Sequence, residues 1–457
     1  MEGLEISVVK LSEVIKSSYS SRWDSFYFQK EFLKDEKIFE TWESLENIAK
    51  IKSGTTPKER DETLKTGVVL LKTNDIRNNI LLDKGDDYFY ISEATNNEML
   101  SSQIESNDIL INIVGATTEV VGRVSFVPQN FKKANITQAM SFIRLTDSKY
   151  SPFFVFIFLQ TKYGLKQTRR IARPTGQYNI NNIELGSYKV PSVSDTFQSK
   201  MESLVKSAHA KLEESKSLYS QAEDLLLNEL GLKEWQPKNT LHTTKKFSDF
   251  AQSGRLDAEY YQPKYDDLFE KLSCLNCKRL GKIVSIKKSF DPGSDAYQET
   301  GIPFIRVSDI SKDGIEKTEL HLSPIDFDIP ELKPKKDTIL FSKDGSIGIA
   351  YKVQSDLNVF TSGALLHLVT TDSSILPDYL TLVLNSVVVK LQAERDSNGA
   401  IIQHWKPSDI ENVIIPILPE QIQKKIASLI QQSFECKAQS KQLLEDAKRM
   451  VETEIEK

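Results

Sequence analysis

The feature that most constrains this fold is an internal repeat. The segments ILINIVGATTEVVG (109–122) and ILFSKDGSIGIA (339–350) are both apolar runs that lead into a glycine-containing turn. Five further pairs of similar segments occur in the same order: 22–32 with 255–265, 45–54 with 280–289, 68–76 with 302–310, 136–145 with 360–369, and 175–193 with 398–418. Because chance matches do not keep a common order, we interpret the chain as one module used twice. A length of 457 residues suits two domains of about 150 to 200 residues with connections.

Each copy begins with strand-like sequence and ends with a long helical pattern. Its first part consists of short Val, Ile and Phe runs, such as 68–71 or 302–305, separated by Gly, Asn, Asp and Pro clusters. From 195 to 230, and again from 420 onward, apolar or small residues recur in alternating steps of four and three, which is typical of a coiled-coil seam. Pro191 and Pro416 stand just before these stretches, where a proline does not interrupt a helix. The sequence therefore predicts an α/β protein with two long helices.

These helices have two possible packing arrangements. Each helix could lie on the globular part of its own copy, or the two helices could pack on each other. About 36 helical residues span roughly 54 Å, enough to hold two globular parts apart, so we favour a paired spacer. The expected organisation is an N-terminal extension with a first domain (1–193), a central helix (194–232), a linker (233–245), a second domain (246–418) and a C-terminal helix (419–457).

The composition excludes several classes of protein. With 39% hydrophobic and 27% charged residues it is typical of a globular chain. The start of the chain shows no signal-peptide pattern, and the longest apolar run (153–159) is far shorter than the roughly 20 residues that span a bilayer, so we expect a cytoplasmic protein without a membrane segment. The formal net charge of −5 means that any nucleic-acid site must be a local patch.

The three cysteines argue against a disulfide scaffold. Cys274 and Cys277 form a CxxC pair, which raises the possibility of zinc. A structural zinc site needs four ligands, however, and Cys436 and the five histidines show no second paired spacing. We therefore expect no metal and interpret these cysteines as packing residues.

Motifs for catalysis are absent from the sequence. It contains no GxxxxGK[ST] phosphate loop, no GxGxxG opening a helix, no DPPY or NPPY tetrapeptide, no HExxH and no GxSxG elbow. What recurs instead is basic segments beside donor-rich turns, at 162–173 and at 278–288. A basic run alone is usually a solvated face, but Arg, Lys, Asn and Gln are the side chains that contact phosphates and base edges. Their presence in both copies favours DNA binding.

At this point the residues resemble a known family, the specificity (S) subunits of type I restriction-modification systems. In each half a GTTP or IPFIRVSDI segment is followed by VGATT or DGSIG after a strand, and then by TGQYNIN or NGAIIQHW. A proline and, in the second half, LPEQIQKKIA then lead into the long helix. The resemblance covers nearly the whole chain, and the combination in this order is specific although each piece alone is weak.

The resemblance implies an α/β fold with internal duplication, in which two target-recognition domains are separated by two long antiparallel coiled-coil helices. Each domain is then expected to read one half of a split target in double-stranded DNA. The chain itself is expected to hold no cofactor and to catalyse no reaction. The implied partners are two modification subunits, which carry S-adenosylmethionine and methylate adenine at N6, and the restriction (motor-nuclease) subunits, which together serve phage defence.

Three alternatives stay open. In a two-subunit system, cleavage and methylation share one partner chain, and the co-purifying partner would identify it. A catalytic methyltransferase would bind S-adenosylmethionine on its own, although the tetrapeptide it needs is missing. A non-catalytic coiled-coil adaptor would not touch DNA.

We expect the DNA contacts to come from turns at strand ends, from the first basic segment and from the TGQYNIN and NGAIIQHW segments. The candidate residues are Lys72, Asn74, Arg77, Thr117, Thr118, Arg123, Arg169, Arg170, Arg173, Gln177, Arg306, Ser308, Lys343, Ser346, Asn398, Gln403 and His404.

Overall fold

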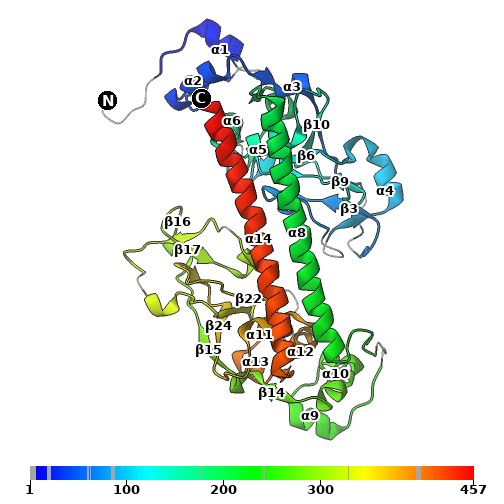
Figure 1. Cartoon of the computed structure of the whole chain (residues 1–457). Coiled ribbons are helices and arrows are strands. Elements are labelled where there is room, and N and C mark those ends of the chain that lie inside the picture. The colour runs from blue at the N-terminus through cyan, green and yellow to red at the C-terminus, as the bar shows by residue number, and fades with distance from the viewer. Residues whose placement is uncertain are drawn as a thin grey trace. The chain divides into compact units, whose positions relative to one another are not determined.

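A computed structural model describes residues 7–17, 22–58, 61, 63–83, 88–174, 176–238, 240, 242–316, 318–327, 329–397 and 403–457. The chain forms two compact units (Figure 1). Unit 1 comprises residues up to Glu213 together with Cys436–Lys457, and unit 2 comprises Glu214–Glu435. The long helices α8 (Asp195–Glu229) and α14 (Glu420–Ile455) each contribute one part to each unit.

The main sheet of unit 1 is mostly antiparallel, with the strand order β2-β10-β6-β8-β4. These strands are β2 (Ala49–Ser53), β10 (Met140–Leu145), β6 (Ile109–Asn112), β8 (Val124–Phe126) and β4 (Asn79–Ile80). A smaller sheet has the order β5-β3-β9, and its strands are β5 (Tyr90–Ile91), β3 (Val68–Leu71) and β9 (Ala134–Ile136). β3 runs parallel to β9. All residues of β3 and β6 are buried, which explains why these runs are continuously apolar rather than alternating.

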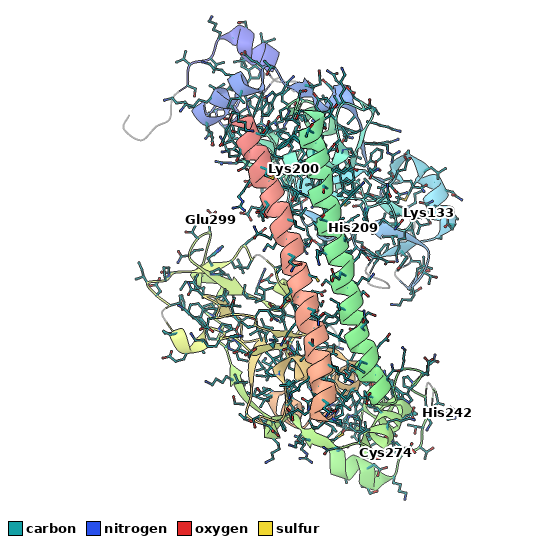
Figure 2. All side chains as sticks on the ribbon, in the orientation of Figure 1. Lys133, Lys200, His209, His242, Cys274 and Glu299 are labelled. Atoms are coloured by element: carbon teal, nitrogen blue, oxygen red, sulfur yellow. The ribbon has the colours of Figure 1, made fainter. Side chains whose placement is uncertain are left out.

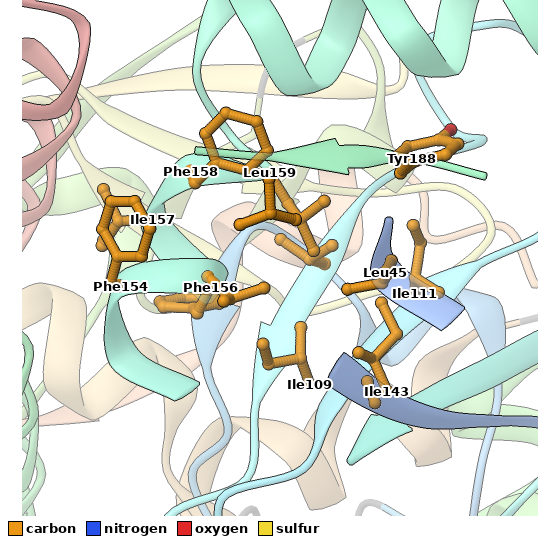
Figure 3. Close-up of a cluster of buried hydrophobic side chains, with 14 of the residues drawn as sticks. Leu45, Ile109, Ile111, Ile143, Phe154, Phe156, Ile157, Phe158, Leu159 and Tyr188 are labelled. Atoms are coloured by element: carbon orange, nitrogen blue, oxygen red, sulfur yellow. The ribbon is translucent and has the colours of Figure 1, made fainter. Parts of the chain in front are cut away.

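Short helices and strands complete unit 1. They are α1 (Leu11–Ser17), α2 (Lys30–Phe39), β1 (Glu43–Ser44), α3 (Leu45–Ile48), α4 (Glu93–Glu98), β7 (Val114–Gly115), α5 (Pro152–Phe158), α6 (Lys162–Ile171), β11 (Arg173–Pro174), β12 (Tyr178–Asn179), α7 (Asn182–Gly186) and β13 (Lys189–Val190). The helix α5 holds the longest apolar run of the chain, and its residues from Phe153 to Phe158 are buried. A helix that is apolar on all sides belongs in a core. Figure 3 shows this core, in which Phe154, Phe156 and Phe158 belong to the same buried cluster as Ile109 of β6 and Ile143 of β10.

Unit 2 repeats the strand pairings of unit 1. Its main sheet has the order β15-β24-β21-β22, and β17 runs parallel to β23 as β3 does to β9. The elements of unit 2 that precede α11 are α9 (Phe247–Ser253), α10 (Pro263–Ser273), β14 (Cys277–Arg279), β15 (Val284–Lys288), β16 (Tyr297–Gln298), β17 (Ile302–Ile305), β18 (Ile310–Ser311), β19 (Gly314–Ile315), β20 (His321–Leu322), β21 (Ile339–Ser342), β22 (Ala350–Lys352), β23 (Phe360–Thr361) and β24 (Leu365–Thr370). They are followed by α11 (Pro377–Asn385), α12 (Val387–Asp396), α13 (Pro407–Glu411) and β25 (Ile414–Pro416).

Within each unit, α8 and α14 share a core with each other and with the neighbouring sheet and helices. In unit 1, Met201 and Val205 of α8 lie in one cluster with Ala447 and Val451 of α14 and with α5. In unit 2, a second cluster joins Ala222 and Leu226 of α8 to Ile426 and Ile430 of α14. In unit 1 the first part of α8 therefore packs with the last part of α14, and in unit 2 the last part of α8 packs with the first part of α14. Within each unit both helices also pack on the globular part.

Two polar positions of the helix seam satisfy one another. Ser215 and Ser433 are buried, their hydroxyl oxygens lie 3.0 Å apart, and Ser433 donates a hydrogen bond to the Ser215 carbonyl at 2.7 Å. A buried hydroxyl without a partner would destabilise the seam, so this pairing explains how serine is accepted there.

The described helices lack the combination of length and apolar character needed to cross a membrane. Within the same part of the chain, no group of three or more His, Cys, Asp or Glu side chains is placed to hold a metal ion. Cys274 follows α10 at an exposed position (Figure 2), Cys277 is half-buried, and neither forms a disulfide.

Candidate nucleic-acid interface

In unit 1 the first group of candidate residues lies where β3 ends. Residues Thr73–Asp75 form a 3₁₀ turn. The backbone N–H of Lys72 caps the start of this turn by donating to the Asp75 carboxylate at 2.8 Å. The side-chain amide of Asn112, at the end of β6, donates to the Thr73 carbonyl at 3.1 Å and ties this turn to the main sheet. Lys72, Asn74 and Arg77 are exposed on it.

The connection between β6 and β8 lies beside the TGQYNIN segment. β12 pairs with β7, and the N–H of Ile180 donates to the Ile113 carbonyl at 2.9 Å. The turn that follows β7 carries Thr117 and Thr118, which are both half-buried. The exposed Gln177 stands just before β12 and therefore lies in the segment that pairs with the start of this turn. Arg123 closes this turn by donating to the Glu119 carbonyl at 3.0 Å.

Unit 2 builds its first turn in the same way. The N–H of Arg306 donates to the Asp309 carboxylate at 2.8 Å, the same contact as between Lys72 and Asp75. The N–H of Ser362 donates to the Ile305 carbonyl at 2.9 Å, which fastens the end of β17 to the loop after β23. Arg306 and Ser308 are exposed on this turn.

The glycine turn of unit 2 also meets its downstream partner. Gly345 donates to the Gln403 carbonyl at 2.9 Å, and Trp405 donates to the Lys343 carbonyl at 2.8 Å. Gln403, His404 and Ser346 are exposed, so this contact presents three polar side chains together. It corresponds to the pairing of β12 with β7 in unit 1.

The charge of this second turn is balanced locally. The carboxylate of Asp344 pairs with the ammonium of Lys343, and its other oxygen lies 2.8 Å from Nδ1 of His404. Lys343 is held close to the protein, with 17% of its side chain exposed. The sequence predicted Lys343 and His404 as site residues but missed Asp344, although it lies in the same DGSIG motif.

The arginines of the first basic segment are paired with acids, which the sequence analysis did not anticipate. Arg170 is only 11% exposed, lies 2.6 Å from Glu36 and stacks over the Tyr27 ring at 4.1 Å. Arg173 pairs with the buried Glu184. Arg169 is 54% exposed and lies 3.2 Å from Glu31. Two of these acids come from α2, more than a hundred residues earlier, so a local count of charges could not find them.

Three candidate residues, Thr118, Arg169 and Arg173, line a pocket of about 760 Å³ in unit 1. Segment 22–26 forms another wall, including Trp23, which is 68% exposed. Tyr178 of β12 completes an aromatic and cationic lining. Arginine and exposed aromatic rings both contact nucleobases. The sequence analysis did not predict Trp23 as a site residue. A large apolar residue stands between Arg and Asp in both RWD and RLD, and this repeated pattern could have identified it.

In unit 1 these contacts join the turn after β3, the turn after β6 and the segment before α7. In unit 2 the turn after β21 contacts the segment before α13 directly, and it reaches the turn after β17 through the loop after β23, where the Lys343 N–H donates to the Ala364 carbonyl at 2.9 Å. Asn398 lies outside the described residues. For the other candidate residues the structure gives positions, and contact with DNA stays a prediction.

Comparison with known proteins bears on this arrangement. The family model for the type I restriction modification DNA specificity domain matches residues 276–449. The type I restriction enzyme MjaIX specificity subunit of Methanocaldococcus jannaschii is 30% identical over 170 residues, which are 35% of this chain and 37% of that protein. The EcoBI specificity subunit of Escherichia coli is 27% identical over 145 residues, 31% of this chain and 30% of that protein. Each match thus spans only about a third of the relative.

Among solved structures, the S subunit of a type I restriction-modification system from M. genitalium covers 91% of this chain and 94% of its own length, with 15% identity and a TM-score of 0.40. The expectation from the sequence motifs agrees with the family model and with both curated relatives. Residues 276–449 of this chain thus match the type I restriction modification DNA specificity domain, and the chain is similar to the specificity subunits of type I restriction enzymes.

Proposed function

We propose that this chain recognises a bipartite target in double-stranded DNA, with unit 1 contacting one half of the target and unit 2 the other. The observation that carries the proposal is that the same three segments converge in both units and present Lys, Arg, Gln, Asn, Ser and His side chains. Such side chains contact phosphates and the edges of bases. The exposed Lys72, Arg77 and Arg306 are the main candidates for phosphate contacts, and Gln177 and Gln403 for base contacts.

The organisation of the chain supports the same proposal. We infer that the common order of strand pairings reflects an internal duplication, and that α8 and α14 form an antiparallel coiled coil serving as a spacer between two target-recognition domains. The domain limits that we propose are those given from the sequence, with recognition domains ending near 193 and 418. A split target needs two readers, which explains why one module occurs twice.

We propose that catalysis lies in the partners. Two modification subunits would bind S-adenosylmethionine and methylate adenine at N6, and restriction subunits would join the same complex. A two-subunit system with a fused nuclease-methyltransferase remains the alternative, and the identity of the co-purifying chain distinguishes the two. The missing tetrapeptide opposes a catalytic methyltransferase, which binding of S-adenosylmethionine to the isolated chain would reveal.

The decisive experiment is sequencing of methylated adenines in cells that carry this chain with its partners. We expect one methylated motif with two specific parts separated by an unspecified gap. Exchange of residues 246–418 for the same segment of a relative should replace one part of the motif and leave the other unchanged. Methylation that is independent of this chain, or an exchange that alters both parts, would contradict the proposal.

A further inference from the structure

The segment that precedes each unit's first strand is fastened to the unit by a repeated set of contacts. Arg22 pairs with Asp24 at 2.6 Å, and Arg255 pairs with Asp257 at 2.6 Å. The ring of Tyr27 lies under both Arg22 and Arg170, at 5.2 Å and 4.1 Å from the guanidinium carbons. In unit 2, Tyr260 lies under Arg255 and Arg395 at 4.9 Å and 5.0 Å. We call residues 22–39 and 255–273 the two clips.

The helices that contact the clips, α6 and α12, can be aligned position by position. Gln167 of α6 makes two hydrogen bonds with the backbone of Lys189, at 3.0 Å and 2.6 Å. Gln392 of α12 makes the same two bonds with the backbone of Ile414, at 3.0 Å and 2.8 Å. Counting from these glutamines, Arg169 corresponds to Glu394, Arg170 to Arg395 and Lys166 to Leu391.

At one equivalent position the ion pair between clip and helix has the opposite polarity. In unit 1, Glu31 of the clip pairs with Arg169 of α6 at 3.2 Å. In unit 2 the clip supplies the cation, because Lys264 pairs with Glu394 of α12 at 2.8 Å. Glu31 and Lys264 both stand nine residues after the arginine of the Arg–x–Asp turn.

The neighbouring contacts differ in chemical kind. The buried Asp35 of the first clip pairs with Lys166 at 2.9 Å. Its counterparts in unit 2 are apolar, because Leu268 and Leu391 are both buried in the hydrophobic core. Glu36 pairs with Arg170, whereas its counterpart Phe269 lies 4.4 Å from the Arg395 guanidinium carbon. An exchanged clip would set Glu31 against Glu394 and place the Asp35 carboxylate among leucines.

We propose that this charge pattern makes each clip specific for its own unit, so that each half of the chain is completed only by the segment that precedes it. Like charges at a contact position oppose docking, and a buried carboxylate without a partner opposes it more strongly. The same contacts would require that a unit exchanged between chains brings its own clip. This inference does not depend on DNA binding.

The test measures hydrogen exchange of the α2 amides in the full-length chain without DNA. Glu31→Lys should speed exchange roughly two- to fivefold, the range expected for loss of an exposed ion pair. Combining it with Arg169→Glu should restore protection, because the pair then has the polarity found in unit 2. Amides of α10 in the same molecule serve as the internal control and should not change.

A transplant separates specificity from simple stabilisation. Replacing residues 22–36 by the sequence of 255–269 should speed exchange in α2 by at least about tenfold, because Lys166 and Arg169 then face apolar and basic side chains. Adding Arg169→Glu and Lys166→Leu should restore most of the protection. Full protection of the transplanted clip without these changes, or failure of both compensated variants, would overturn the proposal.

Discussion

The arginines of α6 differ in how the protein holds them, and this difference separates a candidate DNA contact from a structural role. Arg169 is 54% exposed and lines the pocket, whereas Arg170 is 11% exposed, pairs with Glu36 and stacks over the Tyr27 ring. Burial raises the pKa of Tyr27, which keeps its ring a neutral platform for the guanidinium. The two neighbouring residues should therefore respond differently to the same substitution.

We expect Arg169→Ala to weaken binding to all duplexes alike, because one phosphate contact is lost. The salt slope, which is the slope of the logarithm of the binding constant against the logarithm of the salt concentration, should fall by about one. Arg170→Ala should leave that slope unchanged and destabilise unit 1 by about 1–2 kcal/mol. Binding of labelled duplexes by the assembled methyltransferase at several salt concentrations, with thermal unfolding alongside, checks both. Equal salt slopes for wild type and Arg169→Ala would remove this residue from the interface.

A buried histidine makes the stability of unit 2 depend on pH. His367 of β24 lies opposite Lys287, and its Nε2 is 2.8 Å from the Thr361 hydroxyl. Burial and then the Lys287 charge lower the pKa of His367 from 6.5 to about 4. The unfolded chain takes up a proton below pH 6.5 but the folded chain only near pH 4, so stability falls as the pH falls through this window.

The full loss is about 3 kcal/mol below pH 4, and roughly 2 kcal/mol at pH 5. We expect His367→Gln, which keeps a partner for Thr361, to reduce the difference between the unfolding midpoints of unit 2 at pH 7 and pH 5. His242→Gln, at an exposed position of the same unit, is the matched control and should keep the wild-type difference. An unchanged difference in His367→Gln would contradict the assignment.

At the scale of elements, the sequence carried the information that is periodic or local. The sequence predicted strands from the apolar runs of β3, β6, β17 and β21. It predicted long helices from the prolines before α8 and α14 and from the four-and-three spacing of apolar residues. Each of these features is fixed by burial or by nearby backbone geometry. The pairing of α6 with α2 was not readable, because it joins residues far apart in the chain. For the same reason Asp344 and Trp23 were missed: a local pattern gives the residue type but not the neighbour.

The glycine turns offer a test of how tightly one such element is held. Gly122 and Gly345 both have positive φ, 85° and 71°, so Ala is strained at either position by about 1 kcal/mol. A Cβ on Gly122 would lie 2.5 Å from Cγ2 of Thr168, whereas a Cβ on Gly345 would meet nothing within 4 Å. We expect Gly122→Ala to destabilise its unit more than Gly345→Ala does, by chemical denaturation. Equal losses would mean that the approach of α6 to the turn is loose.

At the scale of the whole molecule, the proposed spacer predicts that helix length sets the gap in the DNA target. The position of an insertion is fixed by the contact between Ser215 and Ser433, whose hydroxyl groups hydrogen-bond across the seam. A heptad placed after Ser215 therefore requires its partner just before Ser433; an insertion at Ser440 would shift the pairing of the residues between them.

One heptad in each helix lengthens the spacer by roughly 10 Å, or about three base pairs, and so moves the second half-target about 100° around the duplex. Three heptads add roughly 31 Å, or about nine base pairs, which is close to a full turn. We therefore expect methylation to fall sharply with one added heptad and to recover with three, at a motif whose gap is about nine base pairs longer. Four-residue insertions at the same points break the seam and serve as the control, because they should abolish activity through the helices themselves. Full methylation at the original spacing by either heptad variant would mean that α8 and α14 do not set the distance between the two readers.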